Sequence, residues 1–163
     1  MKKRVLSILS CIMFCCIIIT TSMVEAQADT ELKIVDGSYL TTQESSTGYT
    51  DNNEEKGIHL MTGDCTISKA GRGRVYAYAS TTANHEVNYI ATHVYVERYL
   101  EDVDAWGYVT SWVEEVENDI YMSTAKTVHV DGGYYYRVRA RHIAGEEYPY
   151  EETASFTNGI WVD

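Results

Sequence analysis

The chain has few of the residues that mark several protein classes. Its 163 residues include one proline, four cysteines, and 13 Lys and Arg against 24 Asp and Glu. The low proline content excludes a collagenous chain, and the apolar content of 45% is too high for a disordered one. The formal net charge of −11 predicts no nucleic-acid or anionic-membrane partner, because an acidic surface repels phosphate groups. One ordinary domain fits this length.

Long apolar runs are confined to the N-terminus. Basic residues 2–4 precede the apolar run from Val5 to Ile19, and the small-x-small site 26–28 follows it. This order is typical of a secretory signal peptide, residues 1–28, which is removed on export. The run of about 15 residues is shorter than the roughly 20 that span a bilayer as a helix. We therefore expect a secreted, extracellular protein with no membrane span after cleavage; an uncleaved anchor and lipidation of Cys11 stay open.

Three of the four cysteines lie in the expected signal peptide, so the processed chain retains only Cys65. It cannot form an intrachain disulfide, although oxidising compartments favour disulfides in small domains. We expect Cys65 to be a buried, small apolar side chain; the alternative is a bridge between the Cys65 residues of two copies. The cysteines and histidines lack the spacing of a zinc site, so no metal ligands are predicted.

Apolar and polar residues alternate from Gly57 to Asp163, and helical periodicity is absent. The 14 tyrosines, with many valines and threonines, suit half-buried strands. Turn residues at short, regular intervals are typical of a sandwich or a barrel. The sequence therefore predicts an all-β fold, a single immunoglobulin-like antiparallel β-sandwich of seven to nine strands in residues 29–163, with 29–56 partly loop. The expected strands are 32–35, 59–61, 65–69, 74–80, 86–100, 106–117, 121–130, 134–143 and 153–162 (bent at 158–159), with a loop at 41–56 and a turn at 63–64.

The segment 130–140 carries a specific fold signal. Val130, Gly133 and Tyr136 have the spacing of a tyrosine corner, in which the tyrosine hydroxyl bonds back to nearby backbone. The segment resembles the E–F corner and F strand of fibronectin type III and other immunoglobulin-like sandwiches. This resemblance implies a fold and no function.

Four further segments carry a second resemblance. They are Leu60 to Cys65, Ser80 to Asn84, Gly133 to Val138 and Phe156 to Trp161. Over most of its length the chain resembles a family of small secreted proteins from Gram-positive bacteria, catalogued as a domain of unknown function. The resemblance supplies no activity, substrate or site.

Strand parity separates an apolar face from a wet face. If the strands 86–100 and 134–143 are sheet neighbours, their wet faces form a tyrosine/arginine face that could bind an acidic glycan or a protein, because arginine pairs with carboxylates. The alternative is structural, with arginines stacked on tyrosines and paired with Glu97. Trp106, Tyr108 and Trp112 share a parity and are expected in the core. The candidate ligand-binding residues of the tyrosine/arginine face are Tyr89, Tyr95, Tyr99, Tyr135, Arg137, Arg139 and Arg141.

Catalytic motifs are missing from the sequence. No Gly-x-Ser-x-Gly elbow occurs, and the five histidines are scattered without His-x-x-x-His spacing. We therefore predict no catalytic residues and no enzyme activity. No cofactor is expected, although the acidic segments 51–55 and 101–104 offer oxygens to calcium; neither matches the helix–loop–helix calcium site, and solvated acidic turns are the simpler interpretation.

The function predicted from these residues is recognition or adhesion outside the cell, through the tyrosine/arginine face. The second candidate is an extracellular structural or assembly subunit, in which strand edges or a Cys65 bridge join copies into a homo-oligomer. A small secreted hydrolase is the third. The residues do not identify the glycan or protein partner.

Overall fold

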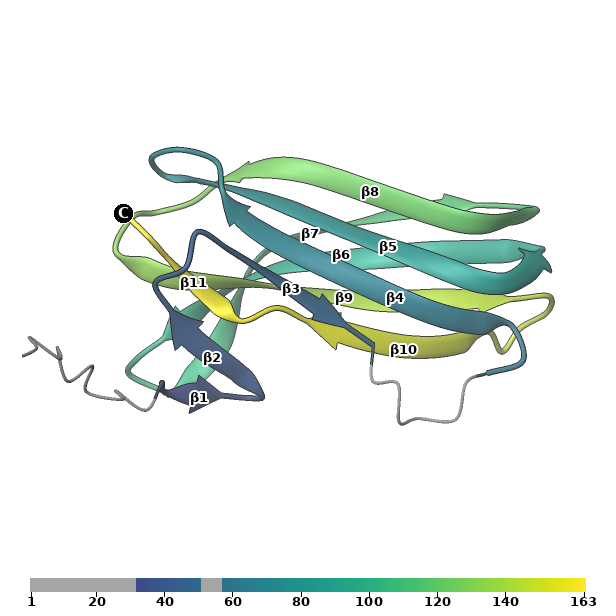
Figure 1. Cartoon of the computed structure of the whole chain (residues 1–163), viewed down its shortest axis with the longest axis horizontal. Helices are drawn as coiled ribbons and strands as arrows, with labels where there is room; N and C mark the ends of the chain where they lie inside the picture. Colours follow the sequence, from purple (N-terminus) through teal and green to yellow (C-terminus); the bar gives the residue numbers. More distant parts are fainter. Residues whose placement is uncertain (1–31, 51–56) are drawn as a thin grey trace, which may run out of the picture. The chain divides into compact units, whose positions relative to one another are not determined.

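Residues 32–50 and 57–163 are described by the computed structural model, and in them the chain folds into eleven β-strands in two sheets (Figure 1). These residues include no helix that is long and apolar enough to cross a membrane. The predicted signal peptide, residues 1–28, lies outside the described residues.

The two sheets differ in size. All described strand pairs are antiparallel except β2 with β11. The smaller sheet has the order β3 (Ser45–Tyr49), β4 (Leu60–Lys69), β5 (Arg74–Val87), β8 (Asp119–His129). The larger sheet has the order β1 (Ile34–Val35), β2 (Ser38–Thr41), β11 (Gly159–Val162), β9 (Tyr134–Gly145), β6 (Tyr89–Leu100), β7 (Ala105–Val116), with β10 (Glu151–Phe156) also paired to β9.

The connections identify the kind of sandwich. The hairpins β4–β5, β6–β7 and β9–β10 each stay within one sheet, whereas the connections β5–β6, β7–β8 and β8–β9 cross between the sheets. This alternation is the Greek-key pattern of immunoglobulin-like sandwiches, so that prediction is confirmed. The strand count exceeds the predicted seven to nine because β2 and β3 were not expected and the last strand is interrupted at residues 157–158, beside the predicted bend.

The predicted loop at 41–56 is wrong for residues 45–49, which form β3 and pair with β4. Short side chains allow this strand to approach the other sheet closely. A Cβ on Gly48 would lie 1.7 Å from the carbonyl oxygen of Phe156, and the Ser46 hydroxyl accepts a bond from the amide of Asn158 at 2.9 Å. Serine, threonine and glycine, which indicate a loop in the sequence, here serve as spacers between two sheets.

Two predicted strand boundaries are also wrong. Gly63 and Asp64 lie inside β4 and form no turn. Gly63 is there because the ring of His142 fills the space that a Cβ would take, 2.2 Å from the ring's Cγ. The expected long strand 86–100 is divided at Asn88, with β5 ending at Val87 and β6 beginning at Tyr89.

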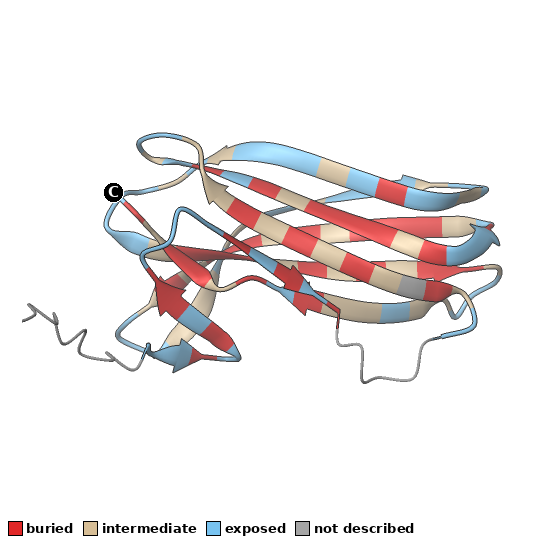
Figure 2. Ribbon diagram, in the orientation of Figure 1, coloured by how far each residue is buried: buried red, intermediate tan, exposed pale blue. Residues whose placement is uncertain are grey.

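The main core lies between the sheets (Figure 2). The predicted apolar faces of β6 and β9 are confirmed, since Val94, Val96 and Val138 are fully buried. Cys65 is also fully buried, and its thiol donates to the carbonyl of Val138 at 3.7 Å. The prediction of a small apolar cysteine is confirmed. A Cys65 bridge between folded copies is wrong, because the sulfur cannot reach the surface without unfolding.

The tyrosine corner is present as predicted. The hydroxyl of Tyr136 donates to the carbonyl oxygen of Asp131 at 2.8 Å, and Gly133 supplies the turn with a φ of 86°. The amide of Gly133 also donates to the carbonyl of Val162 at 2.7 Å. The corner therefore joins the connection between β8 and β9 to the last strand.

A β-bulge in β7 makes the core prediction right for Trp112 and wrong for Trp106 and Tyr108. The register of β6 and β7 shifts between Val96 and Glu97, so that Val109 is left without a partner. Before the bulge, Trp106 packs on the outer cluster of Val35 and Tyr99; beyond it, Trp112 packs against the main core. Tyr108 is 69% exposed. The shared parity is lost because one extra residue rotates the strand.

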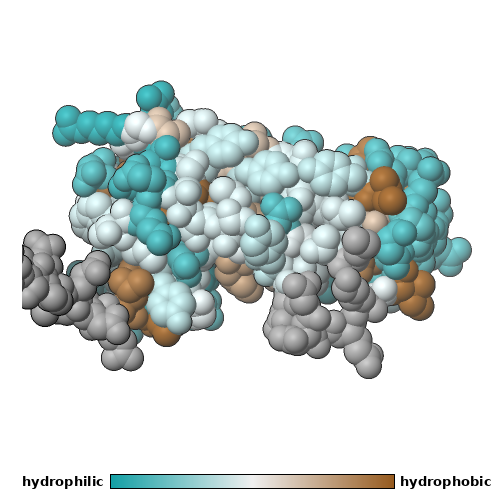
Figure 3. Space-filling model, in the orientation of Figure 1, coloured by the Kyte–Doolittle hydropathy of each residue, from teal (hydrophilic) through white to brown (hydrophobic). Residues whose placement is uncertain are grey.

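Apolar side chains also gather outside the main core. On the face drawn in Figure 3, apolar patches lie over β1 and β2 and at the opposite end of the strands, with polar or neutral surface between them. Leu32 and Ile34 are among the exposed apolar residues at the first end, and Ile58 precedes β4.

Candidate functional site

The structure brings the predicted tyrosine/arginine face together. β6 and β9 are neighbours, with Tyr95 opposite Arg139 and Glu97 opposite Arg137. The condition on which the predicted face depended is therefore met. The state of each arginine then decides whether the face is open to an external ligand.

Arg137 is not available to a ligand. It is 2% exposed, and its Nε donates to Glu97 while Nη2 donates to Asp36, both at 2.8 Å. Nη1 donates to the carbonyl of Asp36 at 3.1 Å and to the hydroxyl of Ser38 at 3.0 Å. The guanidinium carbon lies over the ring of Trp106, 4.6 Å from its centroid, and over the ring of Phe156, 5.3 Å from its centroid. Arg137 thus fastens the β1–β2 turn onto the large sheet.

The other two arginines are also paired with carboxylates. Arg139 stacks on the ring of Tyr95 at 4.0 Å and donates to Glu97 at 2.9 Å. Arg141 makes a two-pronged pair with Glu152 on β10. This hydrogen bonding raises the pKa of Arg141 and lowers that of Glu152. Internal carboxylates therefore occupy all three guanidiniums, as the structural alternative requires.

The tyrosines of the face lie in different surroundings. Tyr89 stacks on Tyr150, with ring centroids 4.6 Å apart. Burial and a hydrogen bond to Glu115 raise the pKa of Tyr89 to about 12. Tyr99 is buried beside β1 and β2, and Tyr135 meets Trp161 edge to face at 5.0 Å. Of the predicted residues, Tyr99 and Tyr135 line a cleft.

This cleft of about 720 Å³ lies beside the end of β6, the start of β9 and β11. Its volume lies within the range of roughly 300 to 1,000 Å³ that is usual for small-molecule sites. The tyrosine corner positions Tyr134 and Tyr135 at the start of β9, directly after Gly133. The aromatic side chains that line the cleft are Tyr99, Tyr134, Tyr135 and Trp161.

Charges of both signs surround this aromatic cleft. Lys33 donates to the hydroxyl of Tyr99 at 2.6 Å, and that hydroxyl donates to Asp104 at 2.8 Å. The bond with Asp104 raises the pKa of Lys33 and lowers that of Asp104. Arg98 lies 4.5 Å from the centroid of the Tyr134 ring. Glu101 adds a negative charge to the lining of the cleft. Sequence reasoning missed Lys33, Tyr134 and Trp161, because the strands that bring them together are distant in the chain.

The structure describes one of the two acidic segments that offer oxygens to calcium. Segment 51–55 lies outside the described residues. In segment 101–104, the carboxylate of Asp104 already pairs with Lys33 at 2.8 Å. A calcium ion bound through this oxygen of Asp104 would have to displace the lysine.

A serine and a histidine also meet inside the protein. Ser155 Oγ lies 2.8 Å from His142 Nε2, and His142 Nδ1 lies 3.0 Å from the hydroxyl of Thr81. Burial lowers the pKa of His142 to about 4. The distances would suit a nucleophile and its base. However, all three residues are fully buried, so no substrate can reach them and the group acts as a satisfied polar cluster in the core.

The chain matches no protein-family model and no curated protein. The resemblance to a family of small secreted bacterial proteins stays a prediction.

Proposed function

We propose that the protein is a secreted, non-catalytic recognition module that binds a neutral oligosaccharide in the aromatic cleft. The observation that carries the proposal is the gathering of three tyrosines and Trp161 around a cavity of about 720 Å³. The proposed class of function is the one predicted from the sequence, but the proposed binding site is the cleft and not the tyrosine/arginine face. Tyr99 and Tyr135 belong to both sites.

Aromatic rings suit a sugar ligand for two reasons. Their faces are flat and apolar, so they can stack on the C–H face of a sugar ring, and the hydroxyl of a tyrosine can bond to a sugar hydroxyl. Tyr134 is 42% exposed and so has free area to offer. Its ring is backed by Arg98, which fixes its orientation before a ligand arrives.

The charges favour a neutral sugar over an acidic one. Lys33 and Arg98 are balanced by Glu101 and Asp102 in the lining, and the chain as a whole carries a formal charge of −11. Sugar hydroxyls both donate and accept hydrogen bonds, so they can use carboxylates and cations alike. A polyanion would meet repulsion from the acidic side of the cleft.

The test is a glycan array followed by calorimetric titration of the sugars that bind. Tyr134→Ala is expected to weaken binding by about 10-fold or more, because the ring that stacks on the sugar is lost. A 10-fold loss of affinity corresponds to roughly 1.4 kcal/mol of binding free energy. Tyr108→Ala is the matched control, since Tyr108 is also an exposed tyrosine but lies on β7 outside the cleft. A folded protein that binds no sugar on the array, or that binds one equally well after Tyr134→Ala, would overturn the proposal.

Assembly into oligomers is the second candidate function. In the described part of the chain, β7 and β8 each pair on one side only, and they span 12 and 11 residues. Free strand edges of this length are templates for pairing with another chain. Sedimentation at several protein concentrations separates the two candidates, because a recognition module stays monomeric while an assembly subunit grows in mass with concentration.

A further inference from the structure

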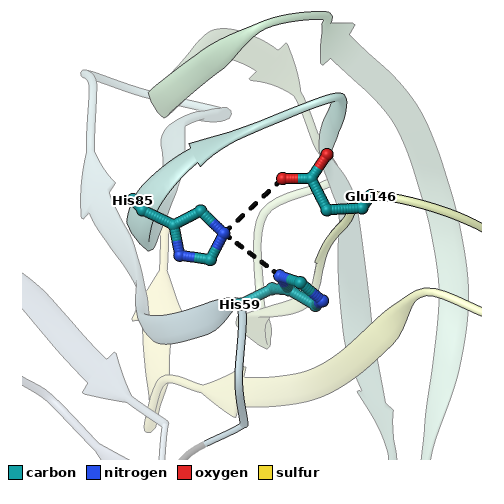
Figure 4. Close-up of side chains that lie close together, drawn as sticks. All are labelled: His59, His85 and Glu146. Atoms are coloured by element: carbon teal, nitrogen blue, oxygen red, sulfur yellow. Dashed lines mark hydrogen bonds and ion pairs between the residues drawn. The ribbon is translucent and has the colours of Figure 1, made fainter.

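Three metal-ligating side chains meet at the end of the sandwich that follows β9, whereas the aromatic cleft lies at the start of that strand. They are His59, which immediately precedes β4, His85 on β5, and Glu146, which follows β9; all three point toward one another (Figure 4). His59 Nδ1 lies 3.2 Å from His85 Nε2. His85 Nε2 lies 3.5 Å from a carboxylate oxygen of Glu146.

These separations match the coordination shell of one ion. Zinc binds nitrogen and carboxylate oxygen at about 2.0 to 2.2 Å, so two ligand atoms on a tetrahedral ion lie about 3.3 to 3.5 Å apart. All three candidate ligand atoms lie within 4.8 Å of one another. An ion could therefore enter with small side-chain adjustments and no change of backbone.

A neighbouring side chain prepares His85 for this role. The Nδ1 of His85 is hydrogen bonded to the side-chain oxygen of Asn84. Because an amide oxygen only accepts, Nδ1 donates to Asn84, and Nε2, the nitrogen that faces His59 and Glu146, is the one placed to bind an ion. Metal-bound histidines commonly hold their second nitrogen in this way.

The backbone around the cluster is fixed by side chains from other strands. The carboxylate of Glu151 accepts bonds from the amides of Ile58, His59 and Leu60 at 2.7 to 2.9 Å. These three bonds lower the pKa of Glu151 against the opposing effect of burial. The side-chain amide of Asn88 donates to the carbonyl of Glu146 at 3.2 Å. The ligands thus stand on anchored segments.

His85 also lies where a strand leaves its regular pairing. β5 and β8 are in register up to Thr82 and pair again only at Val87. The residues between them, His85 included, do not pair with β8, as happens at β-bulges beside functional sites. The side chain of His85 is 45% exposed and that of Glu146 40% exposed, so an ion has access from solvent.

We propose that His59, His85 and Glu146 bind a divalent transition-metal ion, with zinc as the best fit. Two imidazoles and one carboxylate suit zinc, whereas calcium and magnesium prefer an all-oxygen shell. Three protein ligands leave a position for water or for a group from a partner. The ion would tie together the segment before β4, β5 and the β9–β10 connection, which are distant in the sequence.

The first experiment is calorimetric titration of metal-stripped, tag-free protein with zinc chloride. We expect a 1:1 isotherm, a higher melting temperature with zinc, and binding at least about 10-fold weaker in His85→Ala and Glu146→Gln. Glu147→Gln and His129→Ala are the matched controls, since both replace exposed residues outside the cluster. These controls should bind zinc as the unmodified protein does.

A second readout identifies the ligands directly. Cobalt replaces zinc and reports its geometry by visible absorption, and four-coordinate cobalt absorbs strongly while hydrated cobalt does not. We expect the strong band with the unmodified protein, a weaker band with Asn84→Ala, and none with His59→Ala. Titration without a 1:1 event, or equal zinc affinity in His85→Ala that still folds by circular dichroism, would overturn the proposal. Sugar binding to the cleft does not depend on this result.

Discussion

Glu97 holds two arginines at once, and replacing it with alanine is the sharpest test of how the large sheet is stabilised. Its carboxylate accepts bonds from Arg137 at 2.8 Å and from Arg139 at 2.9 Å. The side chain of Arg137 is 2% exposed and that of Glu97 is 10% exposed. After Glu97→Ala, Arg137 keeps one carboxylate partner, Asp36, whose side chain is 73% exposed. An arginine would be left buried with part of its charge uncompensated.

The expected cost follows from this burial. Removing one partner of a buried ion pair lowers the free energy of unfolding by about 3 to 5 kcal/mol. For a domain of this size that corresponds to a melting temperature lower by about 10 to 20 °C. The control is Glu152→Ala, because the pair of Glu152 with Arg141 is 45% and 36% exposed. An exposed pair contributes at most about 1 kcal/mol.

The assay is urea unfolding of the two variants, followed by tryptophan fluorescence and by circular dichroism. A third variant, with Glu97→Ala and Arg137→Met together, should regain much of the lost stability, since it replaces the buried charge by an apolar side chain of similar length. If Glu97→Ala and Glu152→Ala unfold at the same urea concentration, the buried cluster does not hold the β1–β2 turn and the reasoning is refuted.

Three further predictions follow from buried groups. His142 has a pKa near 4 in the folded protein and about 6.5 when unfolded, so the unfolded chain binds more protons in that window. Stability should therefore fall by up to about 3 kcal/mol between pH 6.5 and 4, and urea unfolding at several pH values should show this slope weakened in His142→Gln. Gly48→Ala should lower the free energy of unfolding by about 3 kcal/mol or more in the same assay, because its Cβ would meet a backbone oxygen of Phe156; a variant as stable as the unmodified protein would contradict the close approach of β3 and β10. Burial raises the pKa of the Cys65 thiol to about 12, so a thiol reagent at pH 8 should react only as fast as the protein unfolds, and rapid labelling of folded protein would show that the core is open.

The fold could be predicted because its main features leave periodic or local signals. The alternation of β6 and β9 placed Val94 and Val138 in the core, and the spacing of Val130, Gly133 and Tyr136 gave the tyrosine corner. Strand parity also placed the arginines on the outer face. Each of these signals depends on residues within one strand or one turn.

The remaining features depend on contacts between distant residues. Gly63 indicates a turn in the sequence, and only the ring of His142 explains it inside a strand. The bulge at Val109 changes which face Trp106 and Trp112 occupy. The pairing of Arg137 with Asp36 joins residues that are 101 positions apart. The histidines of the proposed metal cluster are separated by 26 positions, so no short motif could reveal them.

The parallel pairing of β2 with β11 sets the order in which this protein can assemble. β11 lies between β2 and β9, and the hydroxyl of Ser38 donates to the carbonyl of Thr157 across 119 positions. Newly made β1 and β2 therefore have no sheet to join until residues 159–162 have been synthesised. Until then β1 and β2 lack the neighbouring strand β11. Chaperones that bind extended nascent chains would therefore find this segment unfolded throughout synthesis.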